Sequence, residues 1–459
     1  MTRLTPLALA LALAGCASMA PKYERPAAPV APAFPLQAVG GASTEAASGI
    51  AWQRFFADAR LKQLIELALN NNRDLRVAIL NIEQARAQYQ IRRGDRLPSL
   101  NLSVAGNRSP GPDDSITSLY TAGIGVSSFE LDLFGRVRSL SDAGLAQYLA
   151  SEEARKSTHI SLVASVANAY LSLLADEELL GLTQKTLSAR EESLKLIQLK
   201  YDNGVVSKLD LQQGLSLLDS ARVVLAQQQR QRAQDLNLLT LLVGQSLPAG
   251  PDTSTTLAAM SLSELPAGLP SDLLTVRPDI LAAEQQLIAA NANIGAARAA
   301  FFPRITLTGN AGSASSELSG LFKGGSYGWT FAPQMVLPIF DYGRNSANLG
   351  SAKAGRDIAV AQYEKSVQTA FREVSDALAG QATFGEQLRA QRAVAEAEAE
   401  RFKLSDLRYR NGASSYLDLL DAQRSLFSAE QAAVQANLQR LQNQVTLYRV
   451  LGGGWTAPQ

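Results

Sequence analysis

Two similar stretches of sequence decide the fold: KYDNGVVSKLDLQQGLSLLDSA at residues 200–221 and RYRNGASSYLDLLDAQRSLFSA at residues 408–429. They align without a gap at a shift of 208 residues, and ten of the 22 aligned positions are identical. Each begins with a helical pattern, breaks at an Asn-Gly pair and restarts at a serine. Glycine accepts the left-handed conformation that ends a helix, and serine is a good N-cap for the next one. Each stretch is therefore predicted to form the tip of a helical hairpin, one in each of two similar halves.

The composition excludes several classes of function. The chain has 459 residues and a formal net charge of +1, which gives no electrostatic bias toward nucleic acid. His159 and Cys16 are the only histidine and cysteine, so they supply neither a zinc site nor a disulfide within one chain. We expect no enzyme activity and no cofactor. The acidic clusters on the long helices are expected to be solvated, and these are Glu152-Glu153, Asp176-Glu177-Glu178 and Glu191-Glu192.

The amino-terminal residues have the pattern of a lipoprotein signal peptide. Arg3 precedes an apolar run that is too short to span a membrane and that ends in Leu-Ala-Gly-Cys at residues 13–16. These four residues resemble a bacterial lipobox, which implies cleavage before Cys16 and lipidation of that residue, whereas an ordinary secretory signal is the alternative. Ala17 stands where an aspartate would resemble an inner-membrane retention signal, which favours the outer membrane. Residues 16–50 are rich in Pro and Ala and are predicted to form an extended tether.

In each half a helical pattern gives way, at a proline, to the two-residue period of a β-strand. After Pro98, the apolar residues Leu100, Leu102 and Val104 alternate with polar or small ones, and a similar change follows Pro303, which corresponds to Pro98 at a shift of 205. Each half is expected to hold two strands of about ten residues. Strands of this length with one apolar face and one small or polar face are typical of a membrane β-barrel. The edge of a soluble β-sandwich is the alternative.

A long helical hairpin is predicted to end each half. Residues 139–201 and 345–409 contain no proline, and about 60 helical residues make a rod on the order of 90 Å long. Apolar residues recur at three–four spacing along both return helices, at residues 211–243 and 417–448. Such a repeat predicts coiled-coil packing, and it places Arg424 at a seam position where leucine would pack better.

The ordered set of these features resembles the outer-membrane efflux protein (TolC-like) family, in its lipoprotein branch associated with RND-type multidrug efflux pumps. The resemblance covers nearly the whole chain after the signal peptide. Besides the two tips, it is carried by Val276-Arg277-Pro278-Asp279-Ile280, Phe301-Phe302-Pro303-Arg304-Ile305, Asp132-Leu133-Phe134-Gly135-Arg136 and Asp341-Tyr342-Gly343-Arg344.

The predicted fold class is mainly α with a membrane β-barrel. Four strands cannot close a barrel, and lipid does not tolerate open sheet edges, so the chain must assemble with other copies. The resemblance implies a homotrimer in which a 12-stranded outer-membrane β-barrel continues into a long periplasmic α-helical coiled-coil barrel. It also implies a periplasmic adaptor (membrane fusion) protein and an RND-type inner-membrane transporter as partners, with drugs or other small solutes as cargo. The alternatives are a type I protein-secretion or metal-efflux duct of the same fold, or a lipid-tethered periplasmic coiled-coil adaptor.

The second tip is the candidate periplasmic gate. By position, the resemblance assigns the gate to Tyr409, Leu417, Asp421 and Arg424, with Leu417 narrowing the pore. Asp421 and Arg424 are three residues apart, so they share a helix face and can pair. The first half has Gln and Ser at the two corresponding positions, so this lock would be asymmetric between the halves. An ordinary intrahelical ion pair is the alternative.

Asp210 and Asp418 allow two interpretations. Each lies three residues after an N-cap serine, which predicts a capping box. Three copies of each could instead form acidic rings that favour cations. The resemblance further assigns adaptor docking to the turns themselves, at Gly204, Val205, Val206 and Ser207 and at Gly412, Ala413, Ser414 and Ser415.

The domain order that follows has four parts. Residues 1–15 are expected to be a removed signal peptide, 16–50 the tether, 51–250 the first repeat and 251–459 the second. The expected strands lie at about 99–132 and 304–338, and the long hairpins at 139–244 and 345–452.

Overall fold

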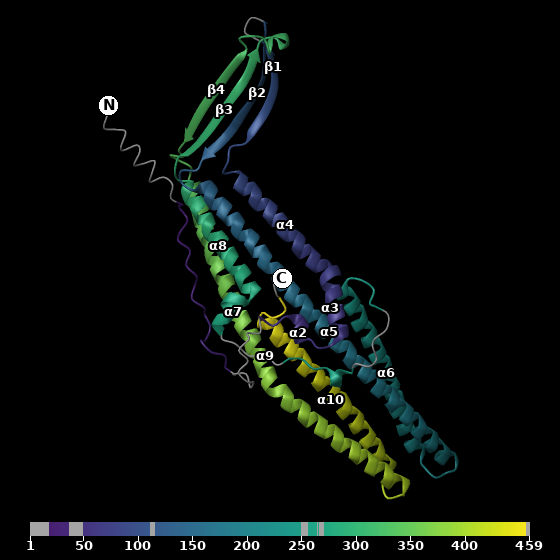
Figure 1. Cartoon of the computed structure of the whole chain (residues 1–459). Helices are drawn as coiled ribbons and strands as arrows, with labels where there is room; N and C mark the ends of the chain where they lie inside the picture. The colour runs from purple at the N-terminus through teal and green to yellow at the C-terminus, as the bar shows by residue number, and fades with distance from the viewer. Residues whose placement is uncertain are drawn as a thin grey trace. The chain divides into compact units, whose positions relative to one another are not determined.

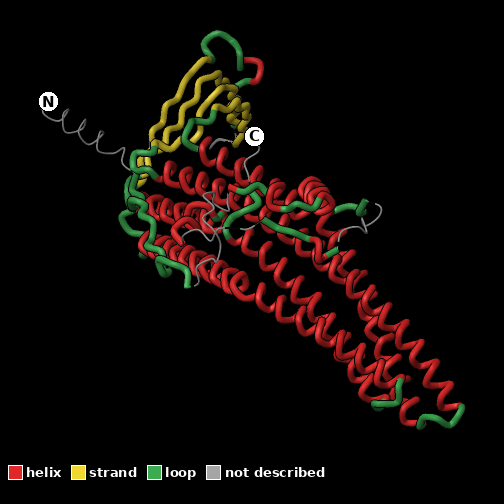
Figure 2. Tube along the Cα trace, turned by 60° about the horizontal axis from the view of Figure 1, so that its bottom comes forward, coloured by secondary structure: helices red, strands yellow, loops and turns green. Residues whose placement is uncertain are grey.

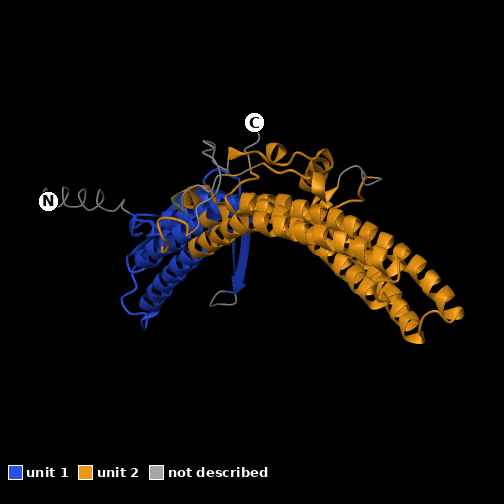
Figure 3. Cartoon of the chain, turned by 90° about the horizontal axis from the view of Figure 1, so that it is seen from below, with its two compact units in different colours: residues 1–28, 80–153, 281–366 blue, residues 29–79, 154–280, 367–459 orange. Residues whose placement is uncertain are grey.

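The computed structural model describes residues 18–35, 49–110, 115–248, 256–263, 265 and 270–455. The predicted signal peptide and Cys16 lie outside the described residues, as does part of the tether. The chain divides into two compact units, shown in Figure 3. Unit 1 consists of residues 1–28, 80–153 and 281–366, and unit 2 of residues 29–79, 154–280 and 367–459.

The order of helices and strands in the first half recurs in the second, as Figure 1 shows. The first half contains α2 (Trp52–Phe55), α3 (Ala59–Asn71), α4 (Arg73–Gly94), β1 (Leu100–Pro110), β2 (Ile116–Leu131), α5 (Arg136–Asp202) and α6 (Lys208–Val243). The second contains η2 (Leu257–Ala259), α7 (Pro270–Val276), α8 (Pro278–Ala299), β3 (Arg304–Ser315), η3 (Leu318–Gly320), β4 (Tyr327–Val336), α9 (Arg344–Arg410) and α10 (Tyr416–Val450).

Unit 1 holds a four-stranded antiparallel sheet in the order β1-β2-β3-β4, drawn in yellow in Figure 2. Leu102 lies opposite Ile124, Ile124 opposite Ala311, and Ala311 opposite Trp329, so these side chains share one face. The neighbouring row, which lies on the other face, is Asn101, Gly125, Asn310 and Thr330. Because side chains alternate along a strand, one face of the sheet is apolar and the other is polar or small.

The apolar face of the sheet is not covered by the described part of the chain. Leu102 is 76% exposed and Trp329 is 71% exposed. β1 and β4 form the two edges, and neither edge pairs with another described strand. An exposed apolar face and two open edges are a liability in water, so this sheet is built for another environment and for further strands.

The tether residues of unit 1 lie against α8. The guanidinium of Arg25 donates two hydrogen bonds of 2.7 Å to the carboxylate of Glu284, and the hydroxyl of Tyr23 donates one of 2.8 Å. The side-chain amide of Asn291 donates to the carbonyl of Pro21 at 2.7 Å. The Glu284 side chain is buried, so the tether supplies the cation that compensates its charge.

Unit 2 holds α6, α10 and the parts of α5 and α9 that pair with them, which together form two helical hairpins. The tips of these hairpins lie side by side in Figures 1 and 2. A hydrophobic cluster joins them near the tips, where Ile197 of α5 and Leu211 of α6 pack with Tyr416 and Leu420 of α10. Gly214 of α6 makes room for this contact, because a Cβ atom there would stand 3.0 Å from the Tyr416 hydroxyl. An apolar segment of α5 is long enough to cross a membrane, but 67% of it is buried within the chain.

The return helices of both halves end at similar junctions in unit 2. The side chain of Asn72, at the start of α4, donates a hydrogen bond of 2.9 Å to the carbonyl of Leu242 in α6. In the second half, the guanidinium of Arg277 donates one of 3.1 Å to the carbonyl of Val450 in α10. Asn72 and Arg277 correspond at the shift of 205, and Leu242 and Val450 at the shift of 208. Both side chains satisfy a carbonyl that a helix end leaves without an intrahelical donor.

The second junction has a charged cluster that the first lacks. The Arg277 side chain is only 7% exposed, and its guanidinium donates to Asp279 at 2.6 Å and to Glu373 at 2.9 Å. These two carboxylates raise the pKa of Arg277 against the opposing effect of its burial. In the first half the residue that corresponds to Glu373 is a serine, and the neutral side chain of Asn72 is the donor to the Leu242 carbonyl.

One expectation about the acidic clusters is wrong. Asp176 of α5 is buried instead of solvated. Its neighbour Glu177 forms an ion pair with Arg232 of α6 at 3.0 Å. Burial raises the pKa of Asp176 to about 7, and the nearby carboxyl of Asp235 adds to the effect. The reason is that α6 packs back over this face of α5, which the pattern of α5 alone does not reveal.

Candidate functional site at the helical tips

Both tips turn through the same backbone motif. Gly204 and Gly412 have φ angles of +73° and +72°, in the left-handed region that a residue with a side chain adopts only at a cost. In each tip the glycine N–H donates to the carbonyl three residues back, and the next N–H donates to the carbonyl five residues back at 2.8 Å. These bonds define a Schellman motif, which satisfies the last carbonyls of α5 and α9.

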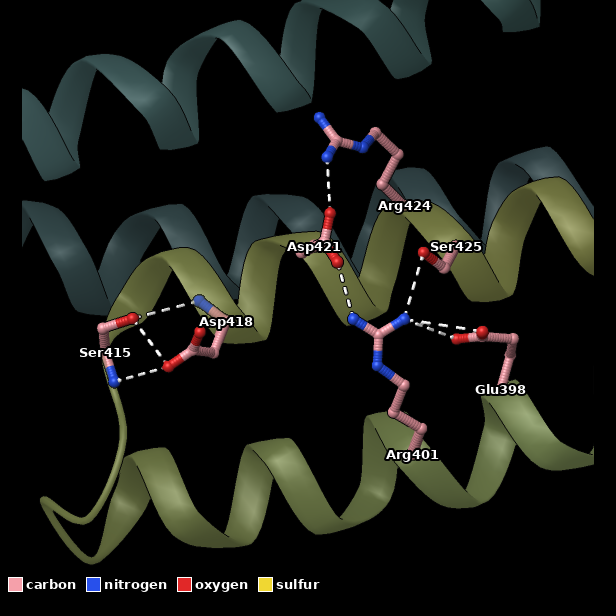
Figure 4. Close-up of polar contacts among 7 residues, drawn as sticks. All are labelled: Glu398, Arg401, Ser415, Asp418, Asp421, Arg424 and Ser425. Atoms are coloured by element: carbon pink, nitrogen blue, oxygen red, sulfur yellow. Dashed lines mark hydrogen bonds and ion pairs between the residues drawn. The ribbon is translucent and has the colours of Figure 1, made fainter.

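A capping box follows each turn. The Oγ of Ser207 accepts from the backbone N–H of Asp210 at 3.1 Å, and Ser415 accepts from Asp418 at 3.2 Å. In return each carboxylate accepts from the serine N–H, at 3.0 and 3.1 Å, as Figure 4 shows for the second tip. The predicted capping boxes are confirmed. Both carboxylates are therefore engaged at the start of their own helix, where the helix dipole favours a negative charge.

The residues assigned to adaptor docking lie at the surface of unit 2. Gly204, Val205, Ser207, Gly412, Ala413 and Ser415 are exposed, and Val206 and Ser414 are half-buried. Because neither glycine has another atom within 4 Å of the place where a Cβ would stand, open space surrounds both turns.

Asp421 links the two helices of the second hairpin. Its Oδ1 accepts a hydrogen bond of 2.5 Å from Arg424 of the same helix, and its Oδ2 accepts one of 2.6 Å from Arg401 of α9 (Figure 4). Arg401 also donates to Glu398 at 3.0 Å. The hydrogen bonds from Arg401 and Arg424 lower the pKa of Asp421, and those to Asp421 and Glu398 raise the pKa of Arg401.

Within one copy of the chain, Arg424 does not lie in the seam between the two hairpins. Its side chain is 69% exposed, and Leu417, one helical repeat earlier, is also exposed. The buried face of α10 near the tip is made by Tyr416, Leu419 and Leu420, which pack toward the first hairpin. Arg424 and Leu417 therefore project from another face of α10, which the described part of the chain leaves open.

Tyr409 belongs to a different part of the tip. Its ring lies 5.5 Å from that of Tyr416, and its hydroxyl accepts a hydrogen bond of 3.3 Å from Lys200 of α5. The Lys200 ammonium also lies 4.5 Å from the centroid of the Tyr409 ring. The structure thus brings Asp421 and Arg424 together, and it places Tyr409 in the packing between the two hairpins.

Arg401 is the residue that the sequence prediction missed. It lies eleven residues before Gly412, and Asp421 lies nine residues after it. In an antiparallel hairpin, residues at similar distances from the turn face each other, so counting outward from the Asn-Gly pair would have found it. Among the described residues, no group of three or more His, Cys, Asp or Glu side chains is placed to hold a metal ion.

Comparison with known proteins decides the family. The sequence model of the outer membrane efflux protein family matches residues 64–245 and 269–453, which together make up most of the chain. The chain belongs to the outer membrane efflux protein family. The two matched segments of this efflux protein each contain two strands and one long helical hairpin.

Relatives of this efflux protein are similar over nearly their whole length. The antibiotic efflux pump outer membrane protein ArpC of Pseudomonas putida is 50% identical, over 97% of this chain and 94% of that protein. The solvent efflux pump outer membrane protein SrpC of Pseudomonas putida is 47% identical, over 99% and 98%. The crystal structure of the open state of the Neisseria gonorrhoeae MtrE outer membrane channel is 42% identical, with a TM-score of 0.88 over 95% of this chain and 98% of that one.

Proposed function

We propose that three copies of this chain form the outer-membrane duct of a tripartite efflux system, with a 12-stranded β-barrel continued by a periplasmic barrel of helices. The four-stranded sheet carries the proposal, in a chain that belongs to the outer membrane efflux protein family. One face of the sheet is apolar and exposed, the other face is polar or small, and both edges are open. The apolar face suits lipid, the polar face suits a water-filled lumen, and closure by further copies removes the edges.

Small organic solutes are the proposed cargo. The names of ArpC and SrpC refer to antibiotic and solvent efflux, and this chain matches both over nearly its full length. The proposed partners are an RND-type inner-membrane transporter and a periplasmic adaptor, which would meet the exposed turns of the two tips. Outer-membrane lipid is the remaining partner, and a lipid on Cys16 would add to the anchor that the sheet provides.

The proposed gate lies at the second tip. Asp421 holds α10 to α9 through Arg401, and it holds Arg424 on the outward face of α10. In three copies around one axis, three such charged clusters would limit the closed opening together with Leu417. In the first half Gln213 and Ser216 occupy the positions of Asp421 and Arg424, so the first tip has no charged cluster at these positions. A similar group there joins Arg222 to Glu191 and Asp219, farther from the turn. Asp210 and Asp418 then serve as helix caps, and an acidic ring would be a second role for the same carboxylates.

Single-channel recording tests the duct and the gate. The purified protein in planar bilayers should show a low closed-state conductance that rises in Asp421→Ala and in Arg424→Ala. Ser216→Ala, at the corresponding position of the first tip, is the matched control and should leave the conductance unchanged. A closed-state conductance that is unaltered in both gate variants would refute the gate.

A cell assay tests the cargo. A strain that lacks its own outer-membrane component but retains an adaptor and an RND transporter should regain resistance to organic antibiotics or solvents when this chain is expressed with them. Recovery of protein secretion or metal resistance, without recovery of resistance to organic compounds, would assign the duct to one of the alternative systems.

A further inference from the structure

The segment that follows β4 is exposed in an unusual way. Ile339 is 92% exposed and Tyr342 is 91% exposed, and the Phe340 side chain between them is exposed as well. Tyr342 has a φ angle of +54°, in a left-handed conformation that is strained for an aromatic residue. Strain and apolar exposure in one short segment indicate a surface that is complete only with a partner.

The corresponding segment of the first half has its partner within the chain. Phe134 precedes the left-handed Gly135, as Tyr342 precedes the left-handed Gly343, at the shift of 208. The ring of Phe134 stacks on Phe302 at a centroid distance of 4.7 Å. β2, the strand before Phe134, pairs with β3, the strand after Phe302. The first half thus supplies a complete example of what the second half lacks.

Pseudo-symmetry identifies the missing partner of Tyr342. Phe302 stands just before Pro303, and the residue in the same place before Pro98 is Leu97, which is exposed. Within one chain, β1 and β4 lie at opposite edges of the sheet, so the two surfaces cannot meet. They can meet between two copies, where β4 of one adjoins β1 of the next.

We propose that β4 pairs with β1 of the next copy in one defined register, in which Met335 lies opposite Val104 and Ile339 opposite Leu100, and that Tyr342 docks on Leu97 of that copy. The proposal rests on the assembly of copies proposed above, and it goes further by fixing which residues meet. The register follows by two independent routes.

The first route uses the two hairpins. Leu100 and Ile305 stand two residues after the corresponding prolines, and they lie opposite Val126 and Met335. Met335 therefore occupies in β4 the place that Val126 occupies in β2. Val126 lies opposite Gly309 of β3, and the residue of β1 that corresponds to Gly309 at the shift of 205 is Val104. Met335 should then lie opposite Val104.

The second route uses the start of the long helices. Leu131 stands four residues before Gly135, as Ile339 stands four residues before Gly343. Leu131 lies opposite Ile305 of β3, which corresponds to Leu100 of β1. Ile339 should then lie opposite Leu100.

The two routes agree on one uninterrupted ladder. Met335 and Ile339 are four residues apart, as are Leu100 and Val104. In the β2–β3 pair, by contrast, the register shifts by one residue between Val126 and Phe129, where a bulge adds one residue to β2. β4 lacks that extra residue, so its strand is predicted to continue to Ile339 once the next copy is present. Continued pairing explains why this segment is so exposed in one copy.

A second copy fits this edge better than lipid does. Lipid can cover apolar side chains, but it cannot accept or donate the backbone hydrogen bonds of an open strand edge. The proposed register also keeps both faces of the sheet consistent, because Met335 and Val104 both belong to the apolar face. A slip by one residue would exchange the faces, which leaves slips of two residues as the competing registers.

Cysteine pairs test the register in the membrane-extracted protein. Directly opposite residues in antiparallel strands have Cβ atoms about 4.5–5.5 Å apart, close to disulfide distance, whereas diagonal neighbours are about 7–8 Å apart. On oxidation, Val104→Cys with Met335→Cys should give covalent trimers on a denaturing gel. The matched control, Leu102→Cys with Met335→Cys, represents a slip of two residues and should remain mostly uncrosslinked. The unchanged protein, which keeps Cys16, controls for background.

The outcomes separate the register from the assembly. Preferential linking of the control pair, or no linking of either pair in variants that are still trimeric by size, would overturn the register and leave the duct intact. A monomeric unchanged protein would overturn the register and the proposed function together. For the docked ring, Tyr342→Ser should lower the temperature at which the trimer dissociates, whereas Phe322→Ser, at another exposed apolar position, should not. Equal effects of the two substitutions would refute the docking of Tyr342.

Discussion

Replacing Arg277 by methionine is expected to lower the free energy of unfolding by about 3 kcal/mol. Arg277→Met keeps most of the side-chain volume, but it leaves the Val450 carbonyl without its donor and Glu373 without its cation. Removing one partner of a buried ion pair costs about 3–5 kcal/mol. The lower end applies because Asp279, the other carboxylate, is partly exposed and can be solvated.

The first half provides the matched comparison. Asn72→Ala removes the neutral donor to Leu242 and the cap that Asn72 provides for the N–H of Leu75, at 2.9 Å. The lost cap costs about 1 kcal/mol and the unpaired carbonyl about 1 kcal/mol more, so a loss of about 2 kcal/mol is expected. The charged junction should therefore be the more sensitive of two otherwise similar sites.

A double variant isolates the charge. Adding Glu373→Gln to Arg277→Met removes the carboxylate that was left unpaired, so part of the lost stability should return, with a coupling of about 1–2 kcal/mol. Urea unfolding of the detergent-solubilised protein, followed by circular dichroism, measures these differences from shifts in midpoint at constant slope. A smaller loss in Arg277→Met than in Asn72→Ala, or a further loss in the double variant, would refute the reasoning.

Three further predictions concern the second tip. Arg401 and Arg424 hold the pKa of Asp421 below its ordinary value of about 4, so the contacts of Asp421 are lost only when the pH falls below that lowered pKa. The closed-state conductance should therefore rise with acid only in that range, and Asp421→Asn should show no such rise. Arg401→Ala should raise the conductance at neutral pH, and bilayer recording that shows no rise would remove Arg401 from the lock. Gly412→Ala should lower the free energy of unfolding in urea by about 1–2 kcal/mol because the φ angle of Gly412 is +72°. Gly350→Ala, in open space within α9, should instead raise it by up to about 1 kcal/mol. Equal effects of the two substitutions would show that the left-handed conformation does not require glycine at residue 412.

Local signals in the sequence were sufficient for the turns. The Asn-Gly pairs and the serines that follow them led directly to the left-handed glycines and capping boxes of both tips, because these features depend only on residues within one turn of helix. Alternation located the four strands, but the expected length of about ten residues was wrong for β2, which has 16 residues. The bulge of β2 at Ser128 had no comparable signal, since serine gives no warning of a φ angle of +56°.

Burial could not be predicted from the period of one helix. Arg424 follows the apolar repeat of α10 and is exposed, whereas Asp176 sits in an acidic run and is buried. Both outcomes depend on which neighbouring helix packs on which face, and neighbours distant in sequence decide that. Arg401 escaped notice for a related reason, because its partner Asp421 lies across the hairpin on another helix.

The contacts of the tether with α8 limit how far Cys16 can lie from α8. The carbonyl of Met19 accepts a hydrogen bond of 3.2 Å from Arg298, and Arg25 is held by Glu284 further along. Three residues of fully extended chain reach at most about 11 Å, so a lipid on Cys16 would have to enter the bilayer within about that distance of Met19. A lipid attached so close to α8 would do more than keep the protein at the membrane. It would fix the height of this part of the chain relative to the membrane surface.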